Sequence, residues 1–280
     1  MIPDKETNLI YLSDLLQDRC PNVFIDIISW FDKLNILWKT LPDTRDIWAV
    51  DFMPLQITKD RFVQFEYDPD YLKFKKYQHT RTNTENVCSR VGITSDKANI
   101  VLDGGNVVKC QTKAILTAKI FKDNPGYTEE NLIEEIRVKL DVEQIIIIPQ
   151  EPGDFIGHAD GMIRFINQDS VLVNKYPQNK TYESFSISLE LCLRNAGLRC
   201  YEIPYTAWQN HSASDATGCY INFLETGDYI FYPTFNHEED AIADSVLKSA
   251  FKHRVLIKID CCELAKLGGI LNCATWNILA

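Results

Sequence analysis

Residues 127–162, YTEENLIEEIRVKLDVEQIIIIPQEPGDFIGHADGM, contain one complete structural unit. Thr128 and the two glutamates that follow it are typical of a helix start, and the predicted helix runs to Leu140. The apolar run QIIIIP at 144–149 then predicts a strand, and GHADGM at 157–162 adds polar side chains between small residues. The unit is therefore a helix, a strand and a polar segment, in that order.

The same order occurs four more times along the chain. Each predicted helix is followed by a short apolar strand and by a segment rich in Gly, Asp, Asn, His or Cys. The predicted helices cover residues 22–37, 71–92, 181–197 and 237–253, and the segments that follow them are WAVDFM (48–53), DGGN (103–106), CYINFL (219–224) and GGILNC (268–273). In the first helix, Ile25, Ile28 and Phe31 predict the buried face.

One polar or sulfur-bearing residue marks each unit. These markers are Asp51, Asp103, His158, Asn222 and Cys273, at separations of 52, 55, 64 and 51 residues. Such near-regular spacing predicts repeats around an axis, with equivalent strand ends meeting at one place. The alternative is an ordinary α+β domain with coincidental spacing. The 280 residues contain no Pro-rich or Gly/Ser-rich linker, which predicts a single domain, 1–280.

Composition and charge narrow the class of protein. Apolar residues make up 45% and charged residues 24% of the chain, and the start MIPDKETN lacks the pattern of a signal peptide. The nine cysteines are scattered without a CxxC pair, which argues against a zinc ribbon and favours a reducing, cytoplasmic location. A net charge of -10 disfavours nucleic acid and membrane surfaces as partners and favours small cations. The sequence is compatible with a monomer and with an oligomer.

If the five segments converge, a cysteine, a histidine and carboxylates share one site. In an extended strand His158 and Asp160 would project from the same face. Paired carboxylates such as Asp51 and Asp160 suit a planar guanidinium cation. Attack on its carbon requires a thiolate, for which Cys273 is the candidate, and a histidine can protonate departing ammonia and then activate water.

The segments WAVDFM, DGGN, GHADGMIRF, CYINFL and GGILNC occur in the order found in agmatine deiminases and bacterial-type peptidylarginine deiminases. Over residues 48–273 the chain resembles this family of the guanidino-group-modifying superfamily. The resemblance implies a five-bladed, pseudo-fivefold α/β propeller, or pentein, with the active site in its central channel. It also implies a deiminase that needs no metal or organic cofactor and acts on a small cationic guanidino substrate through a covalent thiouronium intermediate.

The resemblance implies roles for individual residues. Cys273 corresponds to the nucleophile, His158 to the general acid and base, and Asp51 and Asp160 to the carboxylates that bind the guanidinium. Trp48 matches an aromatic residue of the family's site. Asn222 falls on an asparagine of the fourth motif and is either a substrate contact or purely structural.

Two further aspartates have two interpretations each. Asp103, before Gly104 and Gly105, is either a turn residue or part of the substrate site. Asp154, four residues before His158, either reaches the substrate or caps a loop. The segment 205–218 is predicted to be a surface loop that closes over the channel or packs in one place.

The chain also departs from the family. Val50 stands where members commonly carry Arg, and Asn272 stands where His often precedes the cysteine. The alternative function is therefore a degenerate, non-catalytic member that binds guanidines. The region FEYDPDYL (65–72) contains acids, Glu66, Asp68 and Asp70, in place of arginines that grip a substrate carboxylate, which predicts a neutral or cationic, agmatine-like substrate tail.

Overall fold

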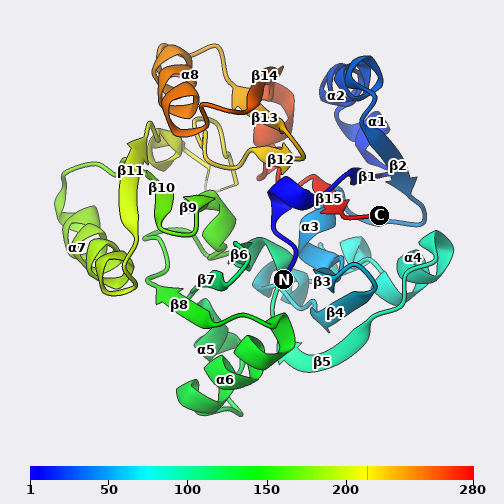
Figure 1. Cartoon of the computed structure of the whole chain (residues 1–280), viewed down its shortest axis with the longest axis horizontal. Coiled ribbons are helices and arrows are strands. Elements are labelled where there is room, and N and C mark those ends of the chain that lie inside the picture. Colours follow the sequence, from blue (N-terminus) through cyan, green and yellow to red (C-terminus); the bar gives the residue numbers. More distant parts are fainter. Residues whose placement is uncertain (213) are drawn as a thin grey trace.

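The strands form five three-stranded sheets arranged around a common centre, with the longer helices on the outside (Figure 1). This arrangement is seen in a computed structural model that describes residues 1–212 and 214–280. The prediction of five units around an axis, an α/β propeller of the pentein type, is confirmed. The sheets are β15-β1-β2, β3-β4-β5, β6-β7-β8, β9-β10-β11 and β12-β13-β14.

The strands are short, as expected for elements that cross one blade. They are β1 (Leu9–Ser13), β2 (Leu37–Leu41), β3 (Leu55–Thr58), β4 (Arg61–Glu66), β5 (Asp96–Val101), β6 (Val108–Lys109), β7 (Lys113–Thr117), β8 (Gln144–Ile148), β9 (Ile163–Asn167), β10 (Ser170–Asn174), β11 (Arg199–Ile203), β12 (Leu224–Thr226), β13 (Tyr229–Thr234), β14 (Val255–Asp260) and β15 (Thr275–Ile278). In every sheet the middle strand pairs antiparallel with one neighbour and parallel with the other.

The helices connect and cover these sheets. The α-helices are α1 (Leu16–Arg19), α2 (Pro21–Leu34), α3 (Ala49–Phe52), α4 (Thr84–Val91), α5 (Lys119–Asp123), α6 (Glu129–Leu140), α7 (Lys180–Asn195), α8 (Glu239–Ala250) and α9 (Cys262–Ala265). Short 3-10 helices are η1 (Asp4–Glu6), η2 (Asp70–Lys73), η3 (Gln78–Thr80), η4 (Gly104–Asn106), η5 (Ala159–Gly161) and η6 (Ala207–Gln209).

The two ends of the chain close the ring in one sheet. Strand β15 pairs antiparallel with β1, so that Leu9 lies opposite Ile278 and Leu12 opposite Thr275. Trp276 of β15 packs against Tyr11 at 5.2 Å between ring centroids, and its Nε1 donates a hydrogen bond to the Pro54 carbonyl. The first and last strands therefore belong to the same blade, and β15 begins two residues after Cys273.

Two of the helix predictions were wrong in detail. In α2 the buried residues are Val23, Phe24, Ile27 and Phe31, whereas Ile25 is 61% exposed. A strict three-residue step drifts around a helix of 3.6 residues per turn, so the buried stripe combines three- and four-residue steps, as from Phe24 to Ile27 and on to Phe31. The predicted helix over 71–92 is reduced to α4, because Asn83 caps it by accepting a hydrogen bond from the Asn86 amide.

The connections between sheets lie at the centre of the ring. Helix α3 links β2 to β3, η4 links β5 to β6, and η5 links β8 to β9. Among them α3 contacts η4, and η4 contacts η5. These three units therefore send their polar segments toward the same central region.

Candidate active site

His158 lies between two carboxylates that come from two other connections. Its Nδ1 is 3.5 Å from Oδ1 of Asp51, which lies in α3, and its Nε2 is 3.0 Å from Oδ2 of Asp103, just before η4. All three residues are buried. Asp103 is thus the hydrogen-bond partner of His158, an arrangement that neither of its two predicted roles included.

The segment GHADGM does not form the extended strand that the sequence predicts. Residues Ala159–Gly161 form the 3-10 helix η5, and His158 is its extended N-cap residue. Asp160 is 2% exposed, and its Oδ2 lies 3.6 Å from Sγ of Cys273. With this turn between them, His158 contacts Asp51 and Asp103, and Asp160 contacts Cys273. In an extended strand the two side chains would have pointed in the same direction.

Cys273 lies in the connection from α9 to β15 and is partly exposed. Its Sγ is 3.6 Å from Oδ2 of Asp160. The backbone amide of Cys273 donates to Oδ1 of Asn222 at 3.3 Å, and Asn222 Nδ2 donates to the Asp160 carbonyl at 3.3 Å. Asn222, buried to 2% exposure, therefore ties the two segments that carry Cys273 and Asp160.

Two glycines permit close approaches in this region. A Cβ at Gly269 would lie 2.6 Å from the Trp48 ring and 3.0 Å from the Cβ of Cys273. A Cβ at Gly105 would lie 2.5 Å from Oδ1 of Asp51 and 2.7 Å from Nδ1 of His158. Trp48 thus lies across a glycine from Cys273, as a side chain that lines the same site.

Burial and neighbouring charges shift the pKa values of Asp51, His158 and Cys273. Burial raises the pKa of Asp51 to about 8, with Asp103 and Asp160 adding to the effect and protonated His158 opposing it. Burial alone would lower the pKa of His158, but Asp51 and Asp103 raise it to about 10. Burial, Asp160 and Asp51 together raise the pKa of the Cys273 thiol well above its usual value. The site thus has more carboxylates than cations and favours a bound positive charge.

Asp154 lies in the loop before His158. Its Oδ1 accepts a hydrogen bond from the Ile156 amide at 2.9 Å, which is the loop-capping contact considered for it. Burial raises the pKa of Asp154, and the charge of His158 lowers it, so the two side chains are within electrostatic range.

Two of the three acids of the region 65–72 form ion pairs within the protein. Asp68 forms an ion pair with Arg81, and Asp70 lies 2.6 Å from Lys73 Nζ and 3.4 Å from Lys119 Nζ. Neutralised carboxylates provide little attraction for a cationic tail. The preference for an agmatine-like tail stays a prediction, and of the three acids only Glu66 has no ion pair within the described residues.

Two buried residues near the site were missed or misjudged. Asn272 Nδ2 donates to Oδ2 of Asp160 at 2.7 Å, although the sequence marked Asn272 only as a departure from the family. Arg164 Nη1 donates to Oδ1 of Asn272 at 2.7 Å. In the sequence, an arginine inside the apolar run MIRFI (162–166) was the signal that could have indicated this partner of Asn272.

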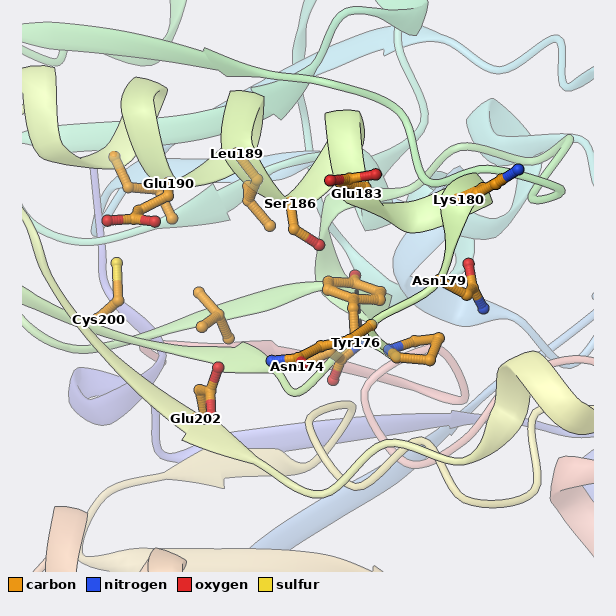
Figure 2. Close-up of a pocket in the computed structure, with 14 residues that line it drawn as sticks. Asn174, Tyr176, Asn179, Lys180, Glu183, Ser186, Leu189, Glu190, Cys200 and Glu202 are labelled. Carbon is orange, nitrogen blue, oxygen red and sulfur yellow. Dashed lines mark hydrogen bonds between the residues drawn. The ribbon is translucent and has the colours of Figure 1, made fainter.

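A cavity of about 810 Å³ lies elsewhere, between α7 and the strands β10 and β11 (Figure 2). Figure 2 shows Glu183, Ser186, Leu189 and Glu190 on the helix facing Cys200 and Glu202 on the strand. The cavity belongs to one blade and is separate from the centre of the ring.

Two features are absent from residues 1–212 and 214–280. In this part of the chain no three His, Cys, Asp or Glu side chains are grouped so that they could hold a metal ion. Nor does any of its helices have the length and apolar character needed to cross a bilayer.

The model of one protein family matches almost the whole chain. Residues 20–278 match the Porphyromonas-type peptidyl-arginine deiminase family. A putative agmatine deiminase from Vibrio parahaemolyticus is 24% identical over 225 residues, which cover 69% of this chain and 62% of that protein. The chain spans 59–62% of the length of the curated relatives that it matches first.

Superpositions on solved structures of the same fold include nearly all of this chain and of the compared chain. The putative arginine deiminase from Porphyromonas gingivalis superposes with a TM-score of 0.78 at 21% identity, over 99% of this chain and 97% of that one. The C. jejuni agmatine deiminase gives a TM-score of 0.79 at 16% identity, over 100% and 96% of the two chains. A Cys-to-Ser variant of the latter, with substrate bound, has the same TM-score. These likenesses establish the fold.

Proposed function

Since this chain belongs to the Porphyromonas-type peptidyl-arginine deiminase family, we propose that it is a C–N hydrolase that converts a guanidino group into a ureido group and releases ammonia. The observation that carries the proposal is the position of Cys273, 3.6 Å from the Asp160 carboxylate in a site that also holds Asp51 and His158. A nucleophile, an acid–base group and carboxylates for a cation are the parts that this reaction needs.

Substrate binding begins with charge. Burial raises the pKa of Asp51 to about 8, and Asp103 and Asp160 add to the effect; a guanidinium bound between Asp160 and Asp51 offsets this excess of negative charge. Asp51 then loses its proton and binds as a carboxylate. The same positive charge lowers the pKa of the neighbouring Cys273 thiol, so that the thiolate forms when its target is present.

The first chemical step forms a C–S bond. The Cys273 thiolate attacks the guanidinium carbon, and the resulting tetrahedral adduct holds three nitrogens and one sulfur. His158, whose pKa is raised to about 10, gives a proton to one terminal nitrogen. The C–N bond breaks with its electron pair on that nitrogen, ammonia leaves, and a thiouronium remains on Cys273.

The second step regenerates the cysteine. Neutral His158 takes a proton from a water molecule, and the hydroxide adds to the thiouronium carbon. The C–S bond breaks with its electron pair on Sγ, and the proton of the added hydroxyl group passes to that sulfur, which leaves a neutral ureido product and the Cys273 thiol. Asp103, 3.0 Å from Nε2, holds the imidazole through both steps and leaves Nδ1, with its longer 3.5 Å contact to Asp51, toward the substrate.

The substrate class is a small molecule or peptide that carries a guanidino group. Agmatine, free arginine and arginyl peptides form the test panel. Agmatine comes first, because the C. jejuni protein of the same fold is an agmatine deiminase and its Cys-to-Ser variant holds substrate.

The test is ammonia release from each compound by the natural chain and by Cys273→Ser. We expect turnover with at least one compound, and a fall in kcat of at least about 10³-fold in the variant, because removal of a nucleophile costs that much in other enzymes. Calorimetry should show that Cys273→Ser still binds the substrate. If the natural chain binds guanidines without releasing ammonia, the non-catalytic interpretation replaces the deiminase.

A further inference from the structure

We propose that Asn272 is a positioning residue for Asp160, and that Arg164 and Asp4 fix Asn272 from behind. The inference rests on the proposed function and names residues to which no role in the site has been assigned. The chain of contacts runs from the reacting cysteine to the 3-10 helix η1 (Asp4–Glu6) near the start of the protein.

The first contact lies at the reacting atoms. Oδ2 of Asp160 is shared between Asn272 Nδ2, at 2.7 Å, and Cys273 Sγ, at 3.6 Å. Within residues 1–212 and 214–280 the other carboxylate oxygen, Oδ1, has no hydrogen-bond donor. Asn272 therefore sets the rotation of the carboxylate, which keeps Oδ1 available for the substrate cation.

The second contact decides which way the Asn272 amide points. Arg164 has only donors, and its Nη1 lies 2.7 Å from Oδ1 of Asn272. The amide oxygen must face Arg164, so the NH₂ group must face Asp160. Asn272 and Arg164 are 7% and 5% exposed, which means that water cannot easily replace either bond.

The third contact anchors the arginine. Arg164 Nη2 is 3.0 Å from Oδ2 of Asp4, whose other oxygen is 3.0 Å from Lys109 Nζ. Burial would raise the pKa of Asp4, but Lys109 and Arg164 lower it overall, so Asp4 stays ionised. Asp4 lies outside residues 20–278, so this anchor is supplied by a part of the chain beyond the family match.

The hydrogen bond from Asn272 to Asp160 also affects how easily the Cys273 thiol ionises. When Cys273 ionises, its negative charge lies next to Oδ2 of Asp160, and like charges at this distance repel. The Asn272 NH₂ group holds its partial positive charge next to that oxygen. Removing it should therefore make thiolate formation harder as well as misplace the carboxylate.

The experiment compares Asn272→Leu, Arg164→Lys and their double variant. Leucine has the size of asparagine without its hydrogen bonds, and a lysine cannot donate to Asn272 and Asp4 from two nitrogens in one plane. Arg137→Lys is the matched control, because Arg137 of α6 also donates from two nitrogens to one carboxylate, Glu134 at 2.6 and 2.7 Å, on a helix at the outside of the ring (Figure 1). The readouts are kcat, KM, and the pH midpoint for alkylation of Cys273 by iodoacetamide, followed by peptide mapping.

We expect Asn272→Leu and Arg164→Lys each to raise KM by about tenfold or more, as loss of a hydrogen bond to a charged group does. The alkylation midpoint should move to higher pH, and the double variant should be no worse than Asn272→Leu alone. Arg137→Lys should match the natural chain. Wild-type KM and midpoint in both variants would overturn the proposal. If the natural chain releases no ammonia, the deiminase function fails, and the alkylation midpoints still decide the positioning role.

Discussion

The pKa values of Asp51 and His158 determine how the activity should depend on pH. Asp51 must be ionised to bind a cation, and its raised pKa of about 8 means that kcat/KM should rise with pH through that value; ionisation of the Cys273 thiol, whose pKa is also raised, adds to the rise at higher pH. His158 must be protonated to release ammonia, so kcat/KM should fall above its pKa of about 10. A pH–rate profile between 6 and 11 measures both limbs.

In that profile, Asp51→Asn should remove the rise below pH 8 while lowering the overall rate. A kcat/KM that stays constant between pH 6 and 9 in the natural chain would contradict the assignment of Asp51 as the titrating carboxylate.

Gly105 is the residue whose substitution should disturb the geometry most directly. An added Cβ would lie 2.5 Å from Oδ1 of Asp51 and 2.7 Å from Nδ1 of His158, so both side chains must move. We expect Gly105→Ala to lower kcat/KM by about 100-fold, the cost of a displacement near 1 Å in an active site.

Gly126→Ala is the control for this substitution, because a Cβ there meets no atom of the described residues within 4 Å. It should retain wild-type kcat/KM. Equal activities of the two alanine variants would show that the His158–Asp51 distance is unimportant for turnover.

At the scale of elements, the sequence predicted the order of the units well and their central segments poorly. The helix at Glu129–Leu140 and the strand at Gln144–Ile148 follow from caps and periodicity, which are local signals. The 3-10 turn at Ala159–Gly161 does not, because it depends on contacts with other connections at the centre of the ring. The pairing of Asp103 with His158, 55 residues apart, is likewise invisible to any local pattern.

The loop that precedes His158 is held by a buried glutamate. Oε1 of Glu151 accepts hydrogen bonds from the Tyr205 hydroxyl at 2.6 Å and, more weakly, from the Tyr182 hydroxyl at 3.4 Å. This joins the loop to the start of segment 205–218, in which Ala216 donates to the Ala265 carbonyl at 2.9 Å and Ala213 lies outside the described residues. Whether the segment closes over the channel stays a prediction.

We expect Tyr205→Phe to lower the free energy of unfolding by about 1–3 kcal/mol, because it leaves a buried carboxylate with one donor fewer. Burial raises the pKa of Glu151 to about 7, so the effect should be measured by urea unfolding at pH 8, where the carboxylate is charged. Tyr182→Phe removes the longer contact and should cost less. A larger loss in Tyr182→Phe would refute this ranking.

For the whole molecule, closure of the ring by β15 should be a main source of stability. Trp276 is 4% exposed and contacts Tyr11 and Phe62, whose ring centroids lie 5.2 and 6.1 Å away. Trp276→Ala should lower the free energy of unfolding by about 3–5 kcal/mol, as other large-to-small core substitutions of this kind do. Trp208→Ala, at a 38% exposed site, should change it by no more than about 0.5 kcal/mol.

Chemical denaturation of both tryptophan variants tests this prediction. If both variants lost a similar free energy of unfolding, the stability of the ring would not depend on the pairing of β1 with β15.

The central claim is that Cys273 carries the guanidino carbon during turnover, in a site assembled from several blades. The most direct measurement is mass spectrometry of the protein quenched with acid during steady-state turnover of the best guanidino substrate. The account predicts an adduct equal to the substrate minus ammonia, mapped to the peptide that contains Cys273 and missing from Cys273→Ser. Ammonia release without an adduct, or with the adduct on another cysteine such as Cys219, would contradict it.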